Sequence, residues 1–273
     1  MTGPPECSVI IPTYNRLTLL RYTLDSLTRQ SLPADRFEVL VVDDGSTDST
    51  RAMVDGYRDR LDLRYFFQPD EGWRVAKARN VGIRHARADR CVFLDAGVLP
   101  RSGCLAAHIT SLDSVDGPAA VCGYVYCLNA DNADAERMRA TIDVADVDIT
   151  IGKLAAERRW LDPREGLYAK FADVLDHLPA PWVVYWTCNV SAHTALIRSV
   201  GMFDEAFQSW GGEDIDLAYR MHRAGATFLL SRAASAIHYP HHKSVDENAE
   251  VAAGNFHYMA TKYKTPLTAL LRG

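Results

Sequence analysis

Residues 39–46 read Val39-Leu40-Val41-Val42-Asp43-Asp44-Gly45-Ser46, a short apolar run that stops at two acids and a glycine. Because polar and apolar residues do not alternate in the run, it predicts a strand covered on both faces, as in a parallel sheet. Similar runs occur on either side, and helical patterns separate them. The other runs are Cys7–Ile11, Leu63–Phe67 and Cys91–Leu94, and the helical patterns cover Leu17–Leu27, about Asp48–Arg60 and Val75–Ala86. This alternation predicts an α/β fold with a mainly parallel central sheet flanked by helices.

The second half of the chain has a less regular pattern. Between Asn129 and Pro181 it is polar and mixed, with a helical stretch at Lys153–Trp160 and no sheet signal. The remaining expected strands are Ala119–Cys127, Val183–Asn189, Phe228–Leu230 and Ala234–Ile237, and the expected helices are Glu213–Ala224 and about Asp246–Tyr263. Because no repeat or interdomain linker interrupts the pattern, residues 1–273 are expected to form a single domain.

Composition excludes several classes of protein. The 273 residues are ample for a sizeable core, and the net charge of −5 gives no electrostatic reason to expect nucleic acid as a partner. No apolar run approaches the ~20 residues that span a bilayer, and Met1–Glu6 carries no signal peptide. The six cysteines form no Cys-x-x-Cys pair, which predicts reduced, buried thiols in a cytoplasmic protein. The Ala- and Arg-rich composition favours a bacterial source, and the sequence carries no signal for an oligomeric state.

Three familiar active-site motifs are missing. No Gly-x-Gly-x-x-Gly follows the first strand, no Gly-Lys-Ser/Thr loop occurs, and no Gly-x-Ser-x-Gly elbow is present. These absences argue against a dehydrogenase, a nucleotide triphosphatase and a serine hydrolase.

An acidic turn opens one of the expected helices in the second half. The sequence there is Trp210-Gly211-Gly212-Glu213-Asp214-Ile215-Asp216-Leu217. Asp214 shares a helical face with Leu217, Ala218 and Met221, so its side chain is expected to point inward. Two interpretations are open at this point: a surface helix with favourable acids in its first turn, or a catalytic base beside an aromatic side chain.

Three polar clusters follow expected strands. Pro12-Thr13-Tyr14, Asp43-Asp44 and Asp95 each lie where a strand ends. In open α/β sheets ligands bind outside the carboxyl ends of the strands, so these clusters are expected to converge on one edge. A carboxylate there can accept a hydrogen bond from a base or a ribose hydroxyl, and the alternative is an ordinary turn with a helix cap.

Two further segments carry candidate ligands for phosphate or metal. Arg74, Lys77 and Arg79 open a helix, where they either meet a phosphate or form a solvated basic face; for Arg79-Asn80 we favour a functional role. The segment His238-Tyr239-Pro240-His241-His242-Lys243 is either a metal or phosphate site or a solvated loop with one packed histidine.

Taken in order, these motifs resemble those of a known enzyme family. The motifs are Ser8-Val9-Ile10-Ile11-Pro12-Thr13-Tyr14-Asn15-Arg16, Val41-Val42-Asp43-Asp44-Gly45-Ser46-Thr47-Asp48, Arg79-Asn80-x-Gly82 and Phe93-Leu94-Asp95. This set resembles family 2 glycosyltransferases. The Trp-Gly-Gly-Glu-Asp turn also resembles the carboxyl-terminal part of galactosyl- and N-acetylgalactosaminyl-transferases, including chondroitin polymerase domains.

The resemblance implies a GT-A fold, a nucleotide-diphosphate sugar donor with uridine favoured by family habit, and inversion at the anomeric carbon. Residues 1–100 would bind the nucleotide sugar, and residues 101–273 would bind the acceptor, a glycan or a small-molecule natural product. The implied donor-binding residues are Pro12, Thr13, Tyr14, Arg16, Asp43, Asp44, Lys77, Arg79, Asp95 and Ala96. Asp214 would be the general base and Glu213 would orient the acceptor hydroxyl, with Trp210, Gly211 and Gly212 forming the acceptor side. A helix N-terminus favours the ionised form that this base requires.

The Asp-x-Asp motif of the family reads Asp95-Ala96-Gly97 in this chain, so its second acid is absent. In the first of three explanations, Asp95 with His238 or His241 holds Mn²⁺ or Mg²⁺ together with the phosphates. In the second, cationic side chains neutralise the diphosphate without metal, the candidates being Arg74, Lys77, Arg79 and Lys243. In the third, the chain is a catalytically silent nucleotide-sugar-binding module. We rank them in that order, because the intact Glu213-Asp214 pair argues against loss of catalysis.

Overall fold

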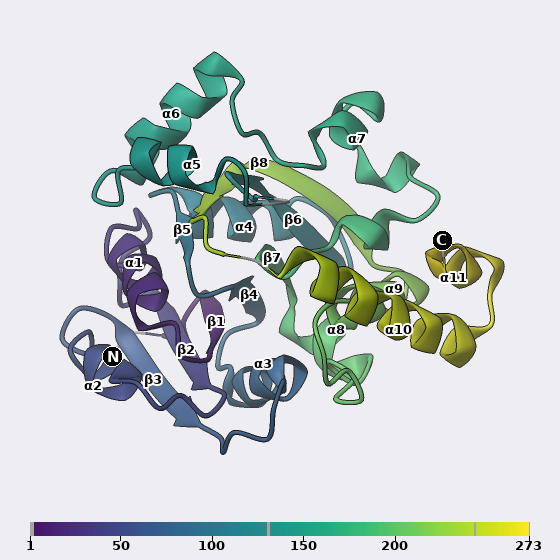
Figure 1. Ribbon diagram of the computed structural model, residues 1–273, viewed down its shortest axis with the longest axis horizontal. Coiled ribbons are helices and arrows are strands. Elements are labelled where there is room, and N and C mark those ends of the chain that lie inside the picture. The colour runs from purple at the N-terminus through teal and green to yellow at the C-terminus, as the bar shows by residue number, and fades with distance from the viewer. Residues whose placement is uncertain (1–2, 130–131, 243, 273) are drawn as a thin grey trace.

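The strands of the protein form one twisted sheet. The computed structural model describes residues 3–129, 132–242 and 244–272. Within these ranges the sheet has eight strands in the order β3-β2-β1-β4-β7-β6-β8-β5. Their bounds are β1 Cys7–Thr13, β2 Phe37–Asp43, β3 Asp62–Phe67, β4 Arg90–Leu94, β5 Val98–Pro100, β6 Ala119–Tyr126, β7 Asn189–His193 and β8 Thr227–His238. Strands from both halves of the chain thus belong to one sheet (Figure 1).

Helices cover both faces of this sheet. In chain order they are α1 Leu17–Leu27, α2 Thr50–Asp55, α3 Val75–His85, α4 Cys104–Leu112, α5 Ala135–Thr141, α6 Val147–Glu157, α7 Glu165–Lys170, α8 Thr194–Ser199, α9 Glu213–Arg223, α10 Val245–Tyr263 and α11 Pro266–Ala269. Short 3₁₀ helices lie at Leu175–His177, Pro181–Val184 and Leu270–Arg272.

The apolar strands are buried on both sides, as their composition predicts. Val9 and Ile11 of β1 pack in one core together with Leu20 of α1. Ile10, between them, points to the other core, where it packs with Ile83 of α3. Alternate side chains of one strand thus serve two cores, so the sheet is the middle of three layers.

The sheet is mixed in direction. β3, β2, β1 and β4 pair in parallel, as the repeated strand-helix pattern predicts. β7 runs antiparallel to both β4 and β6, and β5 runs antiparallel to β8, while β6 and β8 are parallel. The first half therefore supplies a Rossmann-like parallel unit, and the second half extends it with a mixed one.

Several expected elements differ from those observed. The strand expected at Val183–Asn189 is wrong: Pro181–Val184 form a 3₁₀ helix, and the strand begins at Asn189. Trp182 is buried there against the ring of Tyr219, at 5.0 Å between ring centroids, and a short buried apolar run does not distinguish a helical turn from a strand.

Other boundaries shift in a simpler way. The strands expected at 228–230 and 234–237 are one continuous strand, β8, and the helix expected from Asp48 to Arg60 is limited to α2. The helix at Lys153–Trp160 begins earlier, as α6, and ends at Glu157, where Arg158 adopts a left-handed conformation with φ of 50°. The short strand β5 and the helices α4, α5, α7 and α11 were not expected, because they carry weak periodicity.

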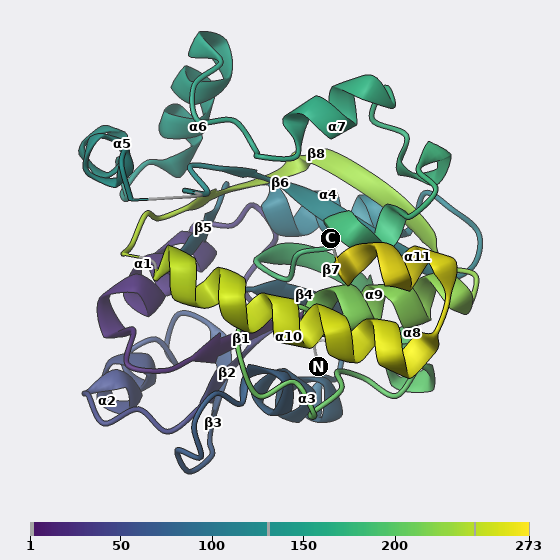
Figure 2. The same cartoon turned by 45° about the vertical axis from the view of Figure 1, so that its right-hand side comes forward.

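The segment between β6 and β7 lies at one end of the molecule, where α5, α6 and α7 flank β8 and β6 (Figures 1 and 2). A buried ion pair holds it to the sheet. The guanidinium of Arg164 donates to both carboxylate oxygens of Asp162, at 2.8 and 2.7 Å. Asp162 Oδ2 also accepts from the backbone N–H of Val125 in β6, at 2.8 Å.

The long helix α10 lies against α9 (Figure 2). The Lys262 ammonium and the Tyr263 hydroxyl of α10 each donate to Asp216 Oδ1, at 2.7 Å. Asp216 is fully buried, and its Oδ2 pairs with Arg220 on the same helix. A buried carboxylate with this many donors is well compensated, so the two helices form one unit.

Two further expectations can be compared with the structure. All six cysteines are free and buried, as predicted. None of the described helices has both the length and the apolar composition needed to cross a bilayer.

Candidate functional site

The polar clusters that follow β1, β2 and β4 do meet at one edge of the sheet. Thr13 at the end of β1 pairs with Asp43 at the end of β2, and Asp43 pairs in turn with Phe67 of β3. On the other side, Ile10 of β1 pairs with Phe93 of β4, two residues before Asp95. The register of four parallel strands therefore brings Pro12, Thr13, Asp43, Asp44 and Asp95 to the same level.

The loops after β1 and β2 are bonded to each other. The backbone N–H of Asn15 donates to the Ser46 hydroxyl at 2.7 Å, and Asn15 Oδ1 accepts from the backbone N–H of Thr47 at 2.9 Å. Asp43 supports this arrangement, because its two oxygens accept from the Ser46 N–H and the Tyr65 hydroxyl, each at 2.7 Å. With both oxygens bonded and its side chain buried, Asp43 holds the shape of this loop, and its expected role in binding the nucleotide sugar stays a prediction.

Asp44 lies at the same edge and is 7% exposed. Its carboxylate accepts from the Gln68 amide at 2.5 Å and from the backbone N–H of Arg74 at 3.0 Å. Burial raises the pKa of Asp44 above its ordinary value of 3.8, and these two donors oppose the shift. Gly45, next to it, has a φ of +98°, and a Cβ there would lie 2.5 Å from the backbone nitrogen of Asp70. The glycine thus lets the loop after β3 lie directly on the turn formed by Asp43, Asp44 and Gly45.

Aromatic and cationic side chains border this edge. Tyr14 is half exposed, and its hydroxyl donates to Asp70 at 2.8 Å. Arg16 precedes α1 and is exposed, while Ala96 is partly buried between β4 and β5. The ammonium of Lys77 is paired with the carboxylate of the exposed Glu71 at 3.1 Å, and the expected contact of Lys77 with a phosphate stays a prediction.

The turn at Trp210 requires its two glycines. Gly211 and Gly212 have φ values of +86° and +99°, which other residues rarely adopt. The turn leads into α9, whose first residues are Glu213 and Asp214. Trp210 is 46% exposed and offers an apolar face beside the acids.

Asp214 points inward, as its helical position predicts. It is partly buried, and its carboxylate accepts from the backbone N–H groups of Ile215 at 2.7 Å and Thr187 at 3.4 Å. Burial and the neighbouring Glu213 carboxylate raise its pKa from 3.8 to about 7, against the opposing charge of Arg79. The helix N-terminus was expected to favour the ionised form, but burial outweighs it. An acid of this pKa is a good proton acceptor near neutral pH.

Arg79 connects the donor edge with the acidic turn. Its guanidinium donates to Glu213 Oε1 at 2.8 Å and to Asp95 Oδ1 at 2.9 Å. The side chain of Arg79 is only 4% exposed, whereas that of Asp95 is 37% exposed. A buried guanidinium needs carboxylates to compensate its charge, and these two supply that compensation. Arg79 thus holds Asp95 and Glu213 together, while its expected role in binding the sugar donor stays a prediction.

Comparisons with known proteins agree with this geometry. The family described as glycosyl transferase family 2 matches residues 8–169, which is more than half of the 273-residue chain. The chain belongs to glycosyl transferase family 2. A second family, described as the N-terminal domain of galactosyltransferase, matches residues 171–243, which include the acidic turn.

One relative of the chain has a name that specifies a transferred sugar and its acceptor. Validoxylamine A glucosyltransferase of Streptomyces hygroscopicus subsp. jinggangensis (strain 5008) is 38% identical over 273 residues, covering 97% of this chain and 63% of that protein. The chain thus spans about three fifths of the length of that relative.

Two solved structures have the same fold. S. aureus TarS 1-349 in complex with UDP has a TM-score of 0.62 at 20% identity and covers 93% of this chain and 65% of its own. Mannosyltransferase PcManGT from Pyrobaculum calidifontis, in complex with GDP-Man and Mn²⁺, has a TM-score of 0.64 at 20% identity and covers 99% of this chain and 69% of its own. The expected family and its GT-A fold are confirmed, while the roles of individual site residues stay predictions.

The residues at the broken Asp-x-Asp motif of this family 2 domain allow a test of the expected metal. His238, at the end of β8, pairs with Val98 of β5, and the backbone N–H of Tyr239 donates to the Gly97 carbonyl at 2.8 Å. Sheet pairing therefore brings His238 close to the Asp95-Ala96-Gly97 segment. His241 stacks on His238 with 5.3 Å between ring centroids.

Across the described ranges, no group of three or more His, Cys, Asp or Glu side chains is arranged to hold a metal ion. A cation at this place would therefore have at most two protein ligands and would take the others from substrate phosphates and water, which Mg²⁺ commonly accepts. The described residues form no protein cage for a metal, and a metal shared with a diphosphate stays a prediction.

The metal-free alternative has less support from the described residues. Arg79 and Lys77 are each paired with carboxylates, and the guanidinium of Arg74 donates to the Trp73 carbonyl at 3.0 Å. The fourth expected cation, Lys243, lies outside the described residues.

Sequence reasoning missed some residues at the site. Gln68 directly follows β3 and binds Asp44, so the same strand-end rule that found Asp44 would have found it. Asn80 was expected to be functional, and its side chain bonds both the N–H and the carbonyl of Phe203, at 2.9 Å each. It thus fixes the loop that leads to the acidic turn. Thr187 carries no sequence signal, because only folding brings its N–H to Asp214.

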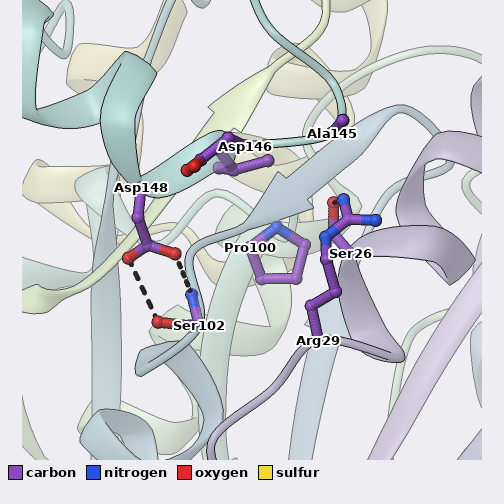
Figure 3. A pocket seen from close by; sticks show the side chains of 8 residues that line it. Ser26, Arg29, Pro100, Ser102, Ala145, Asp146 and Asp148 are labelled. Atoms are coloured by element: carbon purple, nitrogen blue, oxygen red, sulfur yellow. Dashed lines mark hydrogen bonds between the residues drawn. The ribbon is translucent and has the colours of Figure 1, made fainter.

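A cavity of about 160 Å³ lies elsewhere, between the end of α1, the β5–α4 turn and the start of α6 (Figure 3). Asp148 is bonded there to the backbone N–H and the hydroxyl of Ser102, at 3.0 and 3.1 Å. None of the expected donor, acceptor or metal residues lines it.

Proposed function

We propose that the protein is an inverting glycosyltransferase that moves a sugar from a nucleotide-diphosphate donor to an acceptor hydroxyl, with Asp214 as the general base. The observation that carries this proposal is the chain of contacts Asp95–Arg79–Glu213, which joins the carboxyl edge of the sheet to the turn bearing Asp214. A donor on the sheet edge and a base on the turn would then face each other across one site. Membership of glycosyl transferase family 2 supports the same chemistry.

The reaction is a single displacement. The acceptor oxygen attacks the anomeric carbon from the face opposite the leaving group, and its proton moves to a carboxylate oxygen of Asp214. The bond between the anomeric carbon and the diphosphate oxygen breaks, and the nucleotide diphosphate leaves with the bonding electrons. Because Asp214 has a pKa raised to about 7, it accepts this proton more readily than an ordinary aspartate. Oε2 of Glu213 is buried and has no hydrogen-bond partner among the described residues, so a bound acceptor that reaches it would satisfy it.

The donor we propose is a uridine diphosphate sugar. TarS, whose structure contains UDP, supports this choice, while PcManGT contains GDP-Man, so a guanosine donor is the direct competitor. Asp44 would face the base, and Thr13 and Tyr14 would line the nucleoside. A half-exposed aromatic ring such as Tyr14 suits stacking on a base.

Mn²⁺ or Mg²⁺ would be held by Asp95, with His238 as the second protein ligand and His241 as its alternative. Such a cation supplies positive charge to the leaving diphosphate. Asp95 keeps one oxygen directed to Arg79, and its partial exposure leaves the carboxylate accessible.

The acceptor we propose is a small molecule with free hydroxyls. The support is the 38% identity to validoxylamine A glucosyltransferase, a relative whose name specifies a small-molecule acceptor. Glucose is accordingly the sugar to test first, and a glycan acceptor is the alternative. Trp210, beside Gly211 and Gly212, would stack on the acceptor ring.

The test is a transfer assay with UDP-glucose, UDP-galactose and UDP-N-acetylglucosamine, with validoxylamine A as acceptor and Mn²⁺ present or removed by EDTA. We expect Asp214→Asn to lower kcat by about 10³-fold or more, because general base catalysis and orientation are lost together, while UDP binding measured by calorimetry is unchanged. A fully active Asp214→Asn variant would contradict the base assignment.

The competing function is a silent nucleotide-sugar-binding module, and the glycine at position 97 is the feature that favours it. Tight UDP binding without release of UDP from any donor would establish that function. Turnover and UDP binding that are both insensitive to EDTA would remove the metal from the proposal.

A further inference from the structure

One side chain of α10 holds the turn that carries the two acids. Asn255 Nδ2 lies 2.7 Å from the carbonyl oxygen of Gly211 and 3.2 Å from that of Trp210. The same nitrogen lies 3.0 Å from the Ser209 hydroxyl and 3.4 Å from the Ser209 carbonyl oxygen. A single amide thus contacts three consecutive residues directly before Gly212 and the acids.

The turn needs such support because its own backbone is weakly determined. Gly211 and Gly212 both lie in the left-handed region, and glycine loses more conformational freedom on folding than any other residue. A Cβ placed on Gly212 would lie 3.3 Å from the Cβ of Asn255, so helix and turn are in direct contact. The carbonyl of Gly211 is engaged in a part-buried hydrogen bond, and Asn255 is the donor that it requires there.

Asn255 is itself held in place, because α10 is fastened to α9 further along. Lys262 and Tyr263 bind the buried Asp216, and the rings of Tyr219 and Tyr263 lie 4.6 Å apart. The helix that begins with the catalytic turn is therefore bound to α10 at both its first and its second turn. Any movement of Asp214 relative to α10 would have to break these contacts.

We propose that Asn255 is a positioning residue for the general base: its amide fixes the carbonyls of Trp210 and Gly211 and thereby the place of the Asp214 carboxylate relative to the acceptor hydroxyl. The proposal rests on the proposed function. Displacing a catalytic group by about 1 Å can cost on the order of 10²-fold in rate, so the loss of this amide acts on kcat. The nucleoside edge belongs to β1 and β2 and does not contact Asn255, so donor binding is unaffected.

The variants to compare in the full chain are Asn255→Ala and Asn255→Asp. Aspartate has nearly the same shape, but it places an oxygen where the amide donated, so it repels the carbonyls of Trp210 and Gly211. We expect kcat to fall about 10- to 100-fold for Asn255→Ala and further for Asn255→Asp, with KM for UDP-glucose and Kd for UDP within about 3-fold of the parent. Ala253→Asp is the matched control, because residue 253 is exposed on the same helix and receives the same charge.

Two measurements distinguish positioning from mere stability. Hydrogen exchange of residues 209–216 should become faster in Asn255→Ala and stay unchanged in Ala253→Asp. The proposal is wrong if Asn255→Asp keeps kcat within about 2-fold of the parent at equal folded content, or if UDP affinity falls in parallel with kcat.

Asp214→Asn in the same assay separates this proposal from the one on which it rests. If Asp214→Asn is inactive while Asn255→Asp is fully active, only the role of Asn255 fails. If Asp214→Asn is active, the base assignment itself fails, and the role of Asn255 fails with it.

Discussion

At the scale of single residues, Asp214 combines two opposing demands. A base must be close to the reacting hydroxyl, which means partial burial, and burial penalises the charge that makes it a base. The neighbours of Asp214 act in opposite directions. The Glu213 carboxylate repels the charged form of Asp214, whereas Arg79 and the N–H groups of Ile215 and Thr187 stabilise it. As a result, the carboxyl of Asp214 is readily protonated. This suits proton transfer, but holding the charged form in the folded protein lowers the free energy of unfolding.

Because burial disfavours the charged form of Asp214, replacing this aspartate by asparagine should raise the melting temperature, and the gain should depend on pH. The folded pKa of Asp214 is raised from 3.8 to about 7, so the stabilisation from this site is present below 3.8 and is lost as pH rises through the folded value. Asp214→Asn should therefore melt at a higher temperature than the parent at about pH 8, by on the order of 2–4 °C for each kcal/mol gained, and the gain should shrink towards about pH 4. Thermal melts across this range check it; a variant that melts lower at the alkaline end would refute the assigned direction.

At the scale of elements, the link between β4 and β5 is constrained by its glycine. Gly97 has a φ of +103°, and a Cβ there would lie 3.3 Å from the Cβ of Leu19 in α1. Its N–H donates to the Thr23 hydroxyl at 2.9 Å, which anchors the link to that helix. The second acid of the Asp-x-Asp motif is thus missing at a position where this backbone favours glycine.

Restoring that acid should therefore weaken the protein. We expect Gly97→Asp to destabilise the fold by about 1–3 kcal/mol through backbone strain, without raising turnover in the presence of Mn²⁺. Gly97→Ala is the control, because it introduces the strain without the charge and should lose a similar amount. Urea denaturation and the transfer assay measure both effects, and a Gly97→Asp variant as stable as the parent would show that the link relaxes.

At the scale of the whole molecule, the segment between β6 and β7 depends on one buried pair. The side chains of Asp162 and Arg164 are 0% and 3% exposed, and they join this segment to β6 and to the carbonyl of Val184. Because Arg164 would be left as an uncompensated buried charge, we expect Asp162→Asn to cost about 3–5 kcal/mol in the free energy of unfolding.

The exposed pair Arg232–Asp173 in the same region is the matched comparison. Its side chains are 42% and 43% exposed, so Asp173→Asn should cost less than about 1 kcal/mol. Denaturation by urea compares the two variants directly. Equal losses would mean that Asp162 contributes no more than a surface charge.

The sequence by itself determined the parallel half of the sheet and the inward position of Asp214. It also determined that the acids that follow the strands lie at one edge of that sheet. These follow from short-range periodicity: an unbroken apolar run specifies a covered strand, and a helical spacing specifies a face. The family motifs lie in the same local segments, which is why the fold class follows from the order of residues alone.

Only the tertiary structure decided how those residues are used. Arg79 pairs with Glu213 across 134 positions of sequence, Asn255 reaches the glycine turn across 44, and His238 comes beside Gly97 through the pairing of β5 with β8. The hydrogen bond from the Tyr65 hydroxyl to Asp43 likewise joins two neighbouring strands that are 22 positions apart in the sequence. Such contacts depend on which elements the folded sheet places side by side, and no local pattern of residues encodes that choice.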